Sequence, residues 1–298
     1  MGGMKLHKYL RAIGFSQFDT REKIRKLLKA SIISSDYQNF ITNGEDTMLA
    51  NYRKEFFPGC GISVCGELDE NNNFSYDYYF PYLTSSTISS YEDISIERHY
   101  DREAYGGICD DIRVGVTLIF YLENMIDYLK FKNSGRLPIK ETSLCLSGLS
   151  VEGTIMMPIS KNKKQREDSI RKTNNRYRLI QAARRGDEKA IESLTLDDMD
   201  TYSTISKKIH KEDLFSIVDS YFMPYGVESD QYSILGEILE CQKVENELTK
   251  EQIYVMTINC NELCFEVCIN EKDIFGEPEV GRRFKGSVWL QGFINFPE

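Results

Sequence analysis

The chain has 298 residues, of which 41% are hydrophobic and 28% are charged, and its formal net charge is −9 at pH 7. These values are typical of a soluble globular protein with about two domains. The negative charge argues against non-specific nucleic-acid binding by the whole surface. The longest apolar run, near 114–122, is too short to span a membrane. Eight cysteines in a chain of this size without a signal peptide predict reduced thiols and a cytoplasmic location.

The first hundred residues predict two helices followed by strands. Apolar residues at helical spacing predict a short helix over 5–13, and Gly14 follows where a left-handed cap is expected. Asp19 is expected to cap a second helix that runs to about residue 30. Strands are predicted at 62–68 and 74–82, and a third strand at 94–100.

The middle of the chain predicts a long helix over 112–131, with a wide apolar stripe that is expected to pack on the N-terminal sheet. Residues 144–149 and 154–159 predict a hairpin around 151–153. The charged segment 160–168 marks the predicted boundary between a domain of residues 1–160 and a domain of residues 161–298.

The last third predicts a basic helix within 161–185, an acidic helical region after Gly186, a further helix over 196–208 and then a run of strands. The strands are expected over 215–223, 232–240, 253–259, 263–269 and 284–296. Gly236 inside one strand is typical of a barrel corner. We therefore predict an α+β fold. Its N-terminal antiparallel sheet packs on a long helix, and its C-terminal helices precede a small antiparallel β-barrel-like sheet, for which an OB barrel is one option.

The first candidate site is the segment 161–185, which carries ten basic and two acidic residues, a net charge of +8. Such a segment can neutralise phosphates or an acidic partner. The candidate binding residues are Arg171, Lys172, Arg176, Arg178, Arg184 and Arg185. The alternative is a solvated face that the acidic stretch after residue 186 neutralises.

The second candidate is the stretch 281–292, in which Arg282, Arg283 and Lys285 surround Phe284 and Trp289 follows. Cations that alternate with aromatic residues on a barrel strand can hold a nucleotide or a nucleic-acid backbone. The alternative, which we favour, is that the aromatic residues belong to the core and that the arginines pair with nearby acids.

The third candidate is catalytic. Alternation along the strand places Glu97, His99 and Asp101 on one face, and a carboxylate beside a histidine is what a general base needs. No nucleophile or second histidine accompanies them, and an exposed polar strand face explains the same residues. Cys260, Cys264 and Cys268 lack the histidine or second close pair of a zinc site, so we predict neither a metal nor a cofactor.

Several stretches resemble an uncharacterised protein family of clostridial Firmicutes whose members have about this length. The resemblance covers nearly the whole chain and is carried by HKYLRAIGF, ISIERHYD, GICDDIRVGVTLIFYLEN, LSGLSVEGTIMMPI, SIVDSYFMPYGVESDQYSILGEI and GEPEVGRRFKGSVWLQG. It implies a bacterial, intracellular protein, and it implies no activity, cofactor or catalytic residue.

The leading functional hypothesis is a non-enzymatic cytoplasmic binding or interaction protein. Its partner would be an acidic protein or a single-stranded nucleic acid, bound by the basic segment and the basic-aromatic strand. A hydrolase-like enzyme that uses Glu97, His99 and Asp101 in an interdomain cleft is an alternative. A self-associating scaffold, such as a homodimer, is another.

Overall fold

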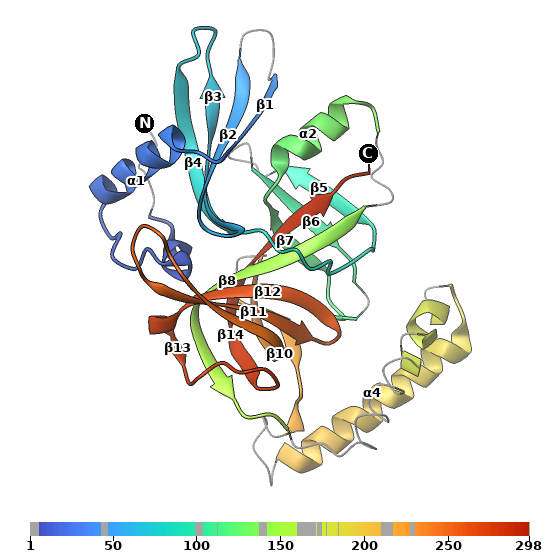
Figure 1. The fold of residues 1–298 in the computed structure, drawn as a ribbon. Helices are drawn as coiled ribbons and strands as arrows, with labels where there is room; N and C mark the ends of the chain where they lie inside the picture. Colours follow the sequence, from blue (N-terminus) through green and yellow to red (C-terminus); the bar gives the residue numbers. More distant parts are fainter. Residues whose placement is uncertain are drawn as a thin grey trace.

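The structure is a computed structural model of the chain. It describes residues 6–42, 47–98, 104–111, 113–136, 142–159, 171, 175–176, 178–183, 185–209, 217–226 and 230–297; at 198 and 200–209 it describes the backbone alone. The chain folds into a four-stranded sheet, a ten-stranded sheet that closes a barrel, and a helical arm (Figure 1). The predicted α+β class is confirmed.

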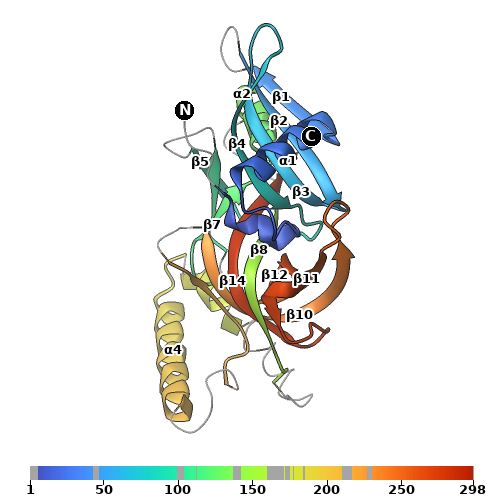
Figure 2. The ribbon, with the colours of Figure 1, turned by 90° about the vertical axis from the view of Figure 1, so that its left-hand side faces the viewer.

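The four-stranded sheet is an antiparallel meander in the order β1-β2-β3-β4. The strands are β1 (Tyr37–Thr42), β2 (Met48–Phe57), β3 (Cys60–Leu68) and β4 (Phe74–Leu83). Two helical elements precede them, η1 (Lys8–Ile13) and α1 (Arg21–Ile33), and α1 lies across β2 and β3 (Figure 2). The predictions for both helices and for β3 and β4 are confirmed, whereas β1 and β2 were not predicted.

Local signals explain the ends of these elements. Gly14 adopts φ 93° and ends η1, as expected for a glycine cap. The Thr20 hydroxyl, rather than the predicted Asp19, caps α1 by accepting a bond from the Lys23 N–H at 3.4 Å. The Asp69 carboxylate accepts bonds from the backbone N–H groups of Asn71 and Asn73, which closes the β3–β4 turn.

The ten-stranded sheet contains a closed barrel of five strands, β8, β12, β11, β10 and β14. Every pair in the barrel is antiparallel except β12 with β8. The strands β7, β6 and β5 extend the sheet from β14. The bounds are β5 (Ile94–Arg98), β6 (Tyr105–Cys109), β7 (Leu118–Leu122), β8 (Ser143–Met156), β9 (Tyr221–Pro224), β10 (Gln231–Glu245), β11 (Gln252–Cys260), β12 (Leu263–Asn270), β13 (Ile274–Phe275) and β14 (Arg283–Asn295), with η2 (Glu271–Asp273) before β13.

The barrel is built differently from the expected run of C-terminal strands. Its fifth strand is β8, from the first half of the chain. Strand β9, which overlaps the strand predicted over 215–223, is not part of the barrel and pairs with β10. The sheet therefore takes strands from both sides of residue 160. Pairing between β8 and β12 is long-range and parallel, and such a contact leaves no local pattern in the sequence.

The helix predicted over 112–131 is wrong. The region forms strand β7 and then a short helix, α2 (Met125–Asn133). The apolar residues that seemed to surround a helix belong to β7, which is buried along most of its length. A short continuous apolar run does not distinguish a buried strand from a buried helix.

The hairpin predicted around 151–153 is also wrong, because β8 runs unbroken from Ser143 to Met156. Gly153 suggested a turn, but it lies inside β8, where the lack of a side chain allows close packing. A Cβ atom at this position would lie 2.4 Å from the ring of Phe284 on the neighbouring strand β14. Glycine is therefore needed for the close approach of an aromatic side chain inside the barrel.

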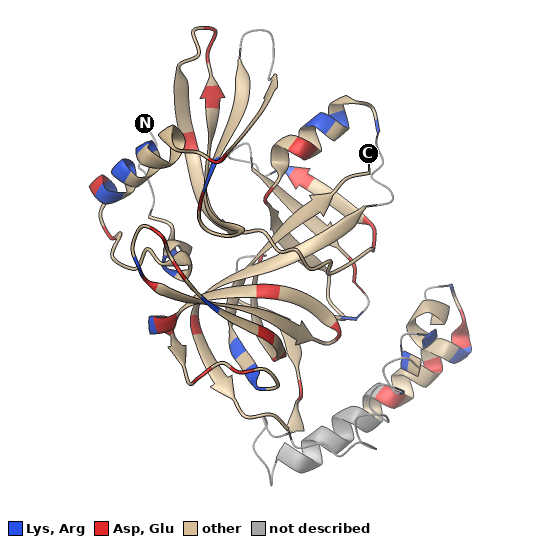
Figure 3. Ribbon diagram, viewed as in Figure 1, with Lys and Arg blue, Asp and Glu red and all other residues tan. Residues whose placement is uncertain are grey.

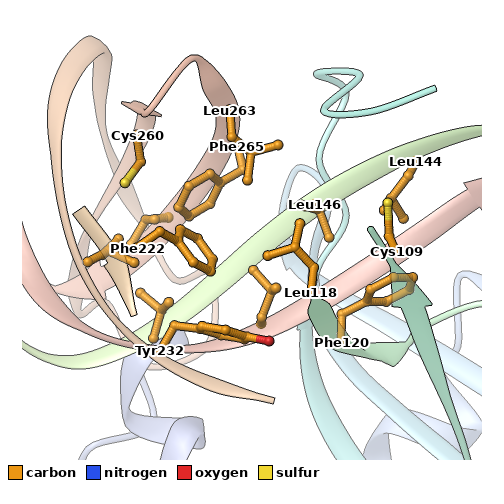
Figure 4. Packing of buried hydrophobic residues seen from close by; sticks show 14 of the residues in the cluster. Cys109, Leu118, Phe120, Leu144, Leu146, Phe222, Tyr232, Cys260, Leu263 and Phe265 are labelled. Carbon is orange, nitrogen blue, oxygen red and sulfur yellow. The ribbon is translucent and has the colours of Figure 1, made fainter. Parts of the chain in front are cut away.

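Two clusters of buried residues form the core. One fills the barrel and continues under β6 and β7, where Phe120, Leu144 and Leu146 meet (Figure 4). The other joins η1, α1 and the four-stranded sheet to the outside of the barrel at Leu149 and Trp289. The second cluster fixes the position of the four-stranded sheet relative to the barrel.

The helical arm consists of the described helical residues between 171 and 183 and of α4 (Glu188–Ile209). Figures 1 and 2 show α4 standing away from both sheets. The helix predicted over 196–208 lies within α4. None of the helices in the described ranges has the length and apolar composition that a membrane crossing requires.

Candidate functional site

A pocket of about 450 Å³ lies between the four-stranded sheet and the turn that joins β7 to α2. One wall comes from β1, β2 and the end of β4, and the other from residues 123–127 together with Phe293 of β14. Figure 1 shows α2 beside β1, and both elements contribute residues to the lining of the pocket. Its volume is within the range of small-molecule sites.

A buried ion pair joins the two walls. Nη2 of Arg53 on β2 lies 3.1 Å from the Glu123 carboxylate, and it donates to the Thr84 hydroxyl at 2.8 Å. Thr84 in turn donates to the same Glu123 oxygen at 2.8 Å, and the Ser147 hydroxyl donates to the other at 3.4 Å. The Glu123 side chain is 0% exposed and that of Arg53 is 16% exposed. Electrostatic interactions are stronger in such a poorly solvated place than in water.

The backbone around Glu123 is fixed to β14. The Glu123 N–H donates to the carbonyl of Gly292 at 2.9 Å. The Asn124 amide donates to the Ile294 carbonyl at 2.9 Å and accepts from the Ile294 N–H at 3.1 Å. The wall that carries Glu123 is therefore held in place before any ligand binds.

Two polar atoms of the pocket residues are buried and have no hydrogen-bond partner among the described residues: Nε of Arg53 and the hydroxyl of Tyr82. Tyr82 is only 1% exposed. A buried polar group without a partner costs about 1–3 kcal/mol of stability. Each such group in a native protein requires an explanation. For the Tyr82 hydroxyl the Arg53 guanidinium supplies part of it, because it interacts with this group and acts to lower the Tyr82 pKa.

Burial also changes the acidity of these groups. It raises the pKa of Glu123, although Arg53, Thr84 and Ser147 oppose the effect. Burial likewise raises the pKa of the Tyr82 phenol. Perturbed ionisable groups that line a pocket are typical of functional sites.

The predicted basic-aromatic strand has its arginines engaged within the protein. Arg282 pairs with Glu279 at 2.8 Å, as the alternative interpretation expected. Arg283 is buried, and it donates to the carbonyls of Met157 at 3.1 Å and Val218 at 2.8 Å.

The aromatic residues of this strand belong to the core. Phe284 is fully buried, and the Trp289 ring stacks on Tyr9 at a centroid distance of 5.3 Å. The Trp289 N–H donates to Asp230 at 2.8 Å. Lys285 is half-buried on β14. A binding role for Arg282, Arg283, Lys285 and Trp289 stays a prediction, and the structure gives these residues other contacts.

The described residues of the predicted basic segment belong to the helical arm or, like Arg185, to the turn before α4. Arg171, Arg176, Arg178 and Arg185 are exposed, whereas Lys172, Arg184 and residues 160–170 lie outside the described residues. Figure 3 shows basic and acidic residues close together at the end of the arm where α4 begins. Binding by this segment stays a prediction.

The predicted acid-base set is described only in part. Glu97 is exposed on the edge strand β5, and His99 and Asp101 lie outside the described residues. All eight cysteines are free thiols. Over the described ranges, no group of three or more His, Cys, Asp or Glu residues is placed to hold a metal ion.

Sequence reasoning did not identify Arg53, Tyr82 and Glu123 as a site. They come from three separate segments, which only the fold brings together. One signal was present: Glu123 directly follows the apolar strand Leu118–Leu122. An acid at the end of a buried strand is uncommon unless it is paired.

A family model described as "Domain of unknown function, E. rectale Gene description (DUF3881)" matches residues 10–292. The match confirms the resemblance found in the sequence. No curated protein and no solved structure matches the chain.

Proposed function

The chain belongs to DUF3881, a domain family of unknown function, and we propose that it binds a small polar molecule in the pocket between the four-stranded sheet and α2. The observation that carries the proposal is a pocket of ligand size lined by the buried Arg53–Glu123 pair and by Tyr82, whose hydroxyl has no hydrogen bond of ordinary geometry. Such buried polar groups lower the stability of the fold, and a phenylalanine at position 82 would avoid part of that loss. Polar groups that reduce stability and line a pocket of ligand size are typical of a binding site.

We favour binding over catalysis because of how Glu123 is engaged. Three of its about four lone-pair positions already accept hydrogen bonds from protein groups. A general base needs a free lone pair that faces the substrate. The described residues that line the pocket include no histidine and no cysteine.

The proposed location is the bacterial cytoplasm. All eight cysteines are free, and reduced thiols are the rule in that compartment.

A ligand panel tests the proposal. Thermal unfolding would be recorded with amines, sugars, nucleosides and carboxylic acids, and each compound that raises the melting temperature would be titrated by calorimetry. Tyr82→Phe should weaken binding by about tenfold, since one hydrogen bond to a buried ligand is worth about 1.4 kcal/mol. Tyr91→Phe is the control, because Tyr91 is 76% exposed and does not line the pocket. A panel without any compound that binds wild type more tightly than Tyr82→Phe removes the proposal.

The helical arm supplies a second candidate, the binding of an acidic protein or a single-stranded nucleic acid. The observation in its favour is that exposed arginines sit on an element that stands clear of both sheets. Arg178→Glu with Arg185→Glu should abolish salt-dependent binding to single-stranded RNA. The matched control is Arg21→Glu with Arg25→Glu on α1, where both arginines are also exposed. Equal RNA binding by the two double variants would contradict the proposal that the helical arm binds RNA.

A further inference from the structure

The charges of the pocket indicate the class of ligand. The lining contains one basic side chain, Arg53, and three acidic ones, Glu55, Glu123 and Asp127. Glu123 is matched by Arg53, with which it forms the buried pair. The carboxylates of Glu55 and Asp127 therefore decide the remaining charge of the pocket, which is negative.

These two carboxylates retain the ability to accept hydrogen bonds. The Glu55 carboxylate accepts none from the described residues, and only the backbone N–H of Glu55 is engaged, with Asp36 at 2.8 Å. One oxygen of Asp127 accepts a bond from the Asn39 amide at 2.7 Å. A carboxylate offers about four lone-pair positions, so both residues can accept further bonds from a ligand.

The nearby lysines are already engaged. Lys54 pairs with Asp36 at 3.0 Å, and the Lys130 ammonium contacts the side-chain oxygen of Asn39. Neither lysine lines the pocket. A cationic group of a ligand would therefore be the counter-charge for Glu55 and Asp127 inside the pocket.

The other lining groups suit the same class. Tyr37 and Phe293 contribute aromatic surface, which attracts cations through the face of the ring. Anionic ligands would be repelled by two uncompensated carboxylates at short range.

We propose, on the basis of the proposed binding function, that the ligand is a small organic diamine, with one ammonium group bound to Glu55 on β2 and the other to Asp127 on α2. The two walls would bind different ends of one ligand.

Three four-carbon probes with the same chain and different ends test this class: putrescine with ammonium ends, butanediol with hydroxyl ends and succinate with carboxylate ends. Calorimetry on the full-length protein should give putrescine an affinity at least about tenfold above that of butanediol, and it should detect no succinate binding. Putrescine binding should weaken as salt is added, because the attraction is electrostatic.

Paired variants locate the effect. Glu55→Gln with Asp127→Asn should weaken putrescine binding by at least about tenfold. Glu237→Gln with Glu240→Gln, which removes the same charge from an exposed part of β10 outside the pocket, should leave it unchanged. Circular dichroism would show that all variants are folded.

The two proposals fail in different ways. If butanediol, succinate or another non-amine of the panel binds best, and Tyr82→Phe weakens that binding, the pocket is a binding site and the amine class is wrong. Failure of putrescine to bind at millimolar concentration overturns the amine class. Both proposals are wrong if, in addition, the ligand panel yields no compound whose binding is weakened by Tyr82→Phe.

Discussion

The guanidinium carbon of Arg53 lies 3.6 Å from the centre of the Tyr82 ring, over its face. The Tyr82 hydroxyl has no hydrogen bond of ordinary geometry among the described residues, although the Arg53 guanidinium interacts with it and acts to lower its pKa against the effect of burial. The burial of these polar groups therefore lowers the free energy of unfolding. Pairs of matched variants can measure that loss.

Tyr82→Phe should not destabilise the protein. Because the Tyr82 hydroxyl is buried without a partner, its removal should leave the free energy of unfolding unchanged or raise it by about 1 kcal/mol. Tyr232 is equally buried, at 1% exposure, but its hydroxyl accepts a bond from the Ile119 N–H at 2.8 Å. Tyr232→Phe should therefore lower the free energy of unfolding by about 1–2 kcal/mol in urea titrations. Equal losses for both variants would show that Tyr82 has a partner in solution.

The Arg53–Glu123 pair should be more sensitive to the loss of one partner than to the loss of both. Glu123→Gln leaves a mostly buried guanidinium without its counter-ion, and it should lower the free energy of unfolding by about 3 kcal/mol. Arg53→Met combined with Glu123→Leu removes both charges and should be the more stable of the two variants. A double variant that is less stable than Glu123→Gln would contradict this account.

The sequence pattern predicted those parts of the fold whose signals are local. Alternation of apolar and polar residues identified β3, β4, β11, β12 and β14. The barrel depends instead on β8, whose parallel contact with β12 joins residues more than one hundred positions apart. Gly153 was taken for a turn because its true reason, the Phe284 ring, lies on another strand.

The pocket could not be predicted for a related reason. Its two walls come from distant parts of the chain, and Arg53 and Glu123 are brought together by the packing of the four-stranded sheet against the end of β7, which pairs with β14. The basic segment was conspicuous because charge is visible in a sequence without knowledge of contacts. A buried ion pair is not visible in this way, because each member looks like an ordinary surface residue.

Asp111 should make the protein sensitive to acid. Asp111 is 2% exposed, and its carboxylate accepts bonds from the Arg113 side chain at 2.8 Å and the Ser90 hydroxyl at 2.6 Å. Burial acts to raise the pKa of Asp111, but the bonds from Arg113 and Ser90 outweigh it and hold the pKa below its ordinary value. The stabilisation is therefore present above the unfolded-state pKa of about 4 and is lost as the pH falls through the folded-state pKa.

Asp111→Asn should accordingly lower the free energy of unfolding by about 2–3 kcal/mol at pH 7, and the difference from wild type should shrink below about pH 4. Urea titrations across this pH range would measure it. Asp110→Asn is the control, because Asp110 is exposed and bonds only the Thr117 hydroxyl in the described structure. A pH-independent loss for Asp111→Asn would mean that the charge of Asp111 is unimportant.

The cysteines should differ widely in reactivity, since only the thiolate attacks an alkylating reagent. Burial raises the pKa of Cys65 to about 11 and that of Cys260 to about 12. Cys241 and Cys264 are only partly buried. Brief treatment of the native protein with iodoacetamide should therefore label Cys241 and Cys264 first, as read by mass spectrometry of peptides. All eight cysteines should react in denaturant, and early labelling of Cys260 would show that the barrel opens at the end where β11 meets β12.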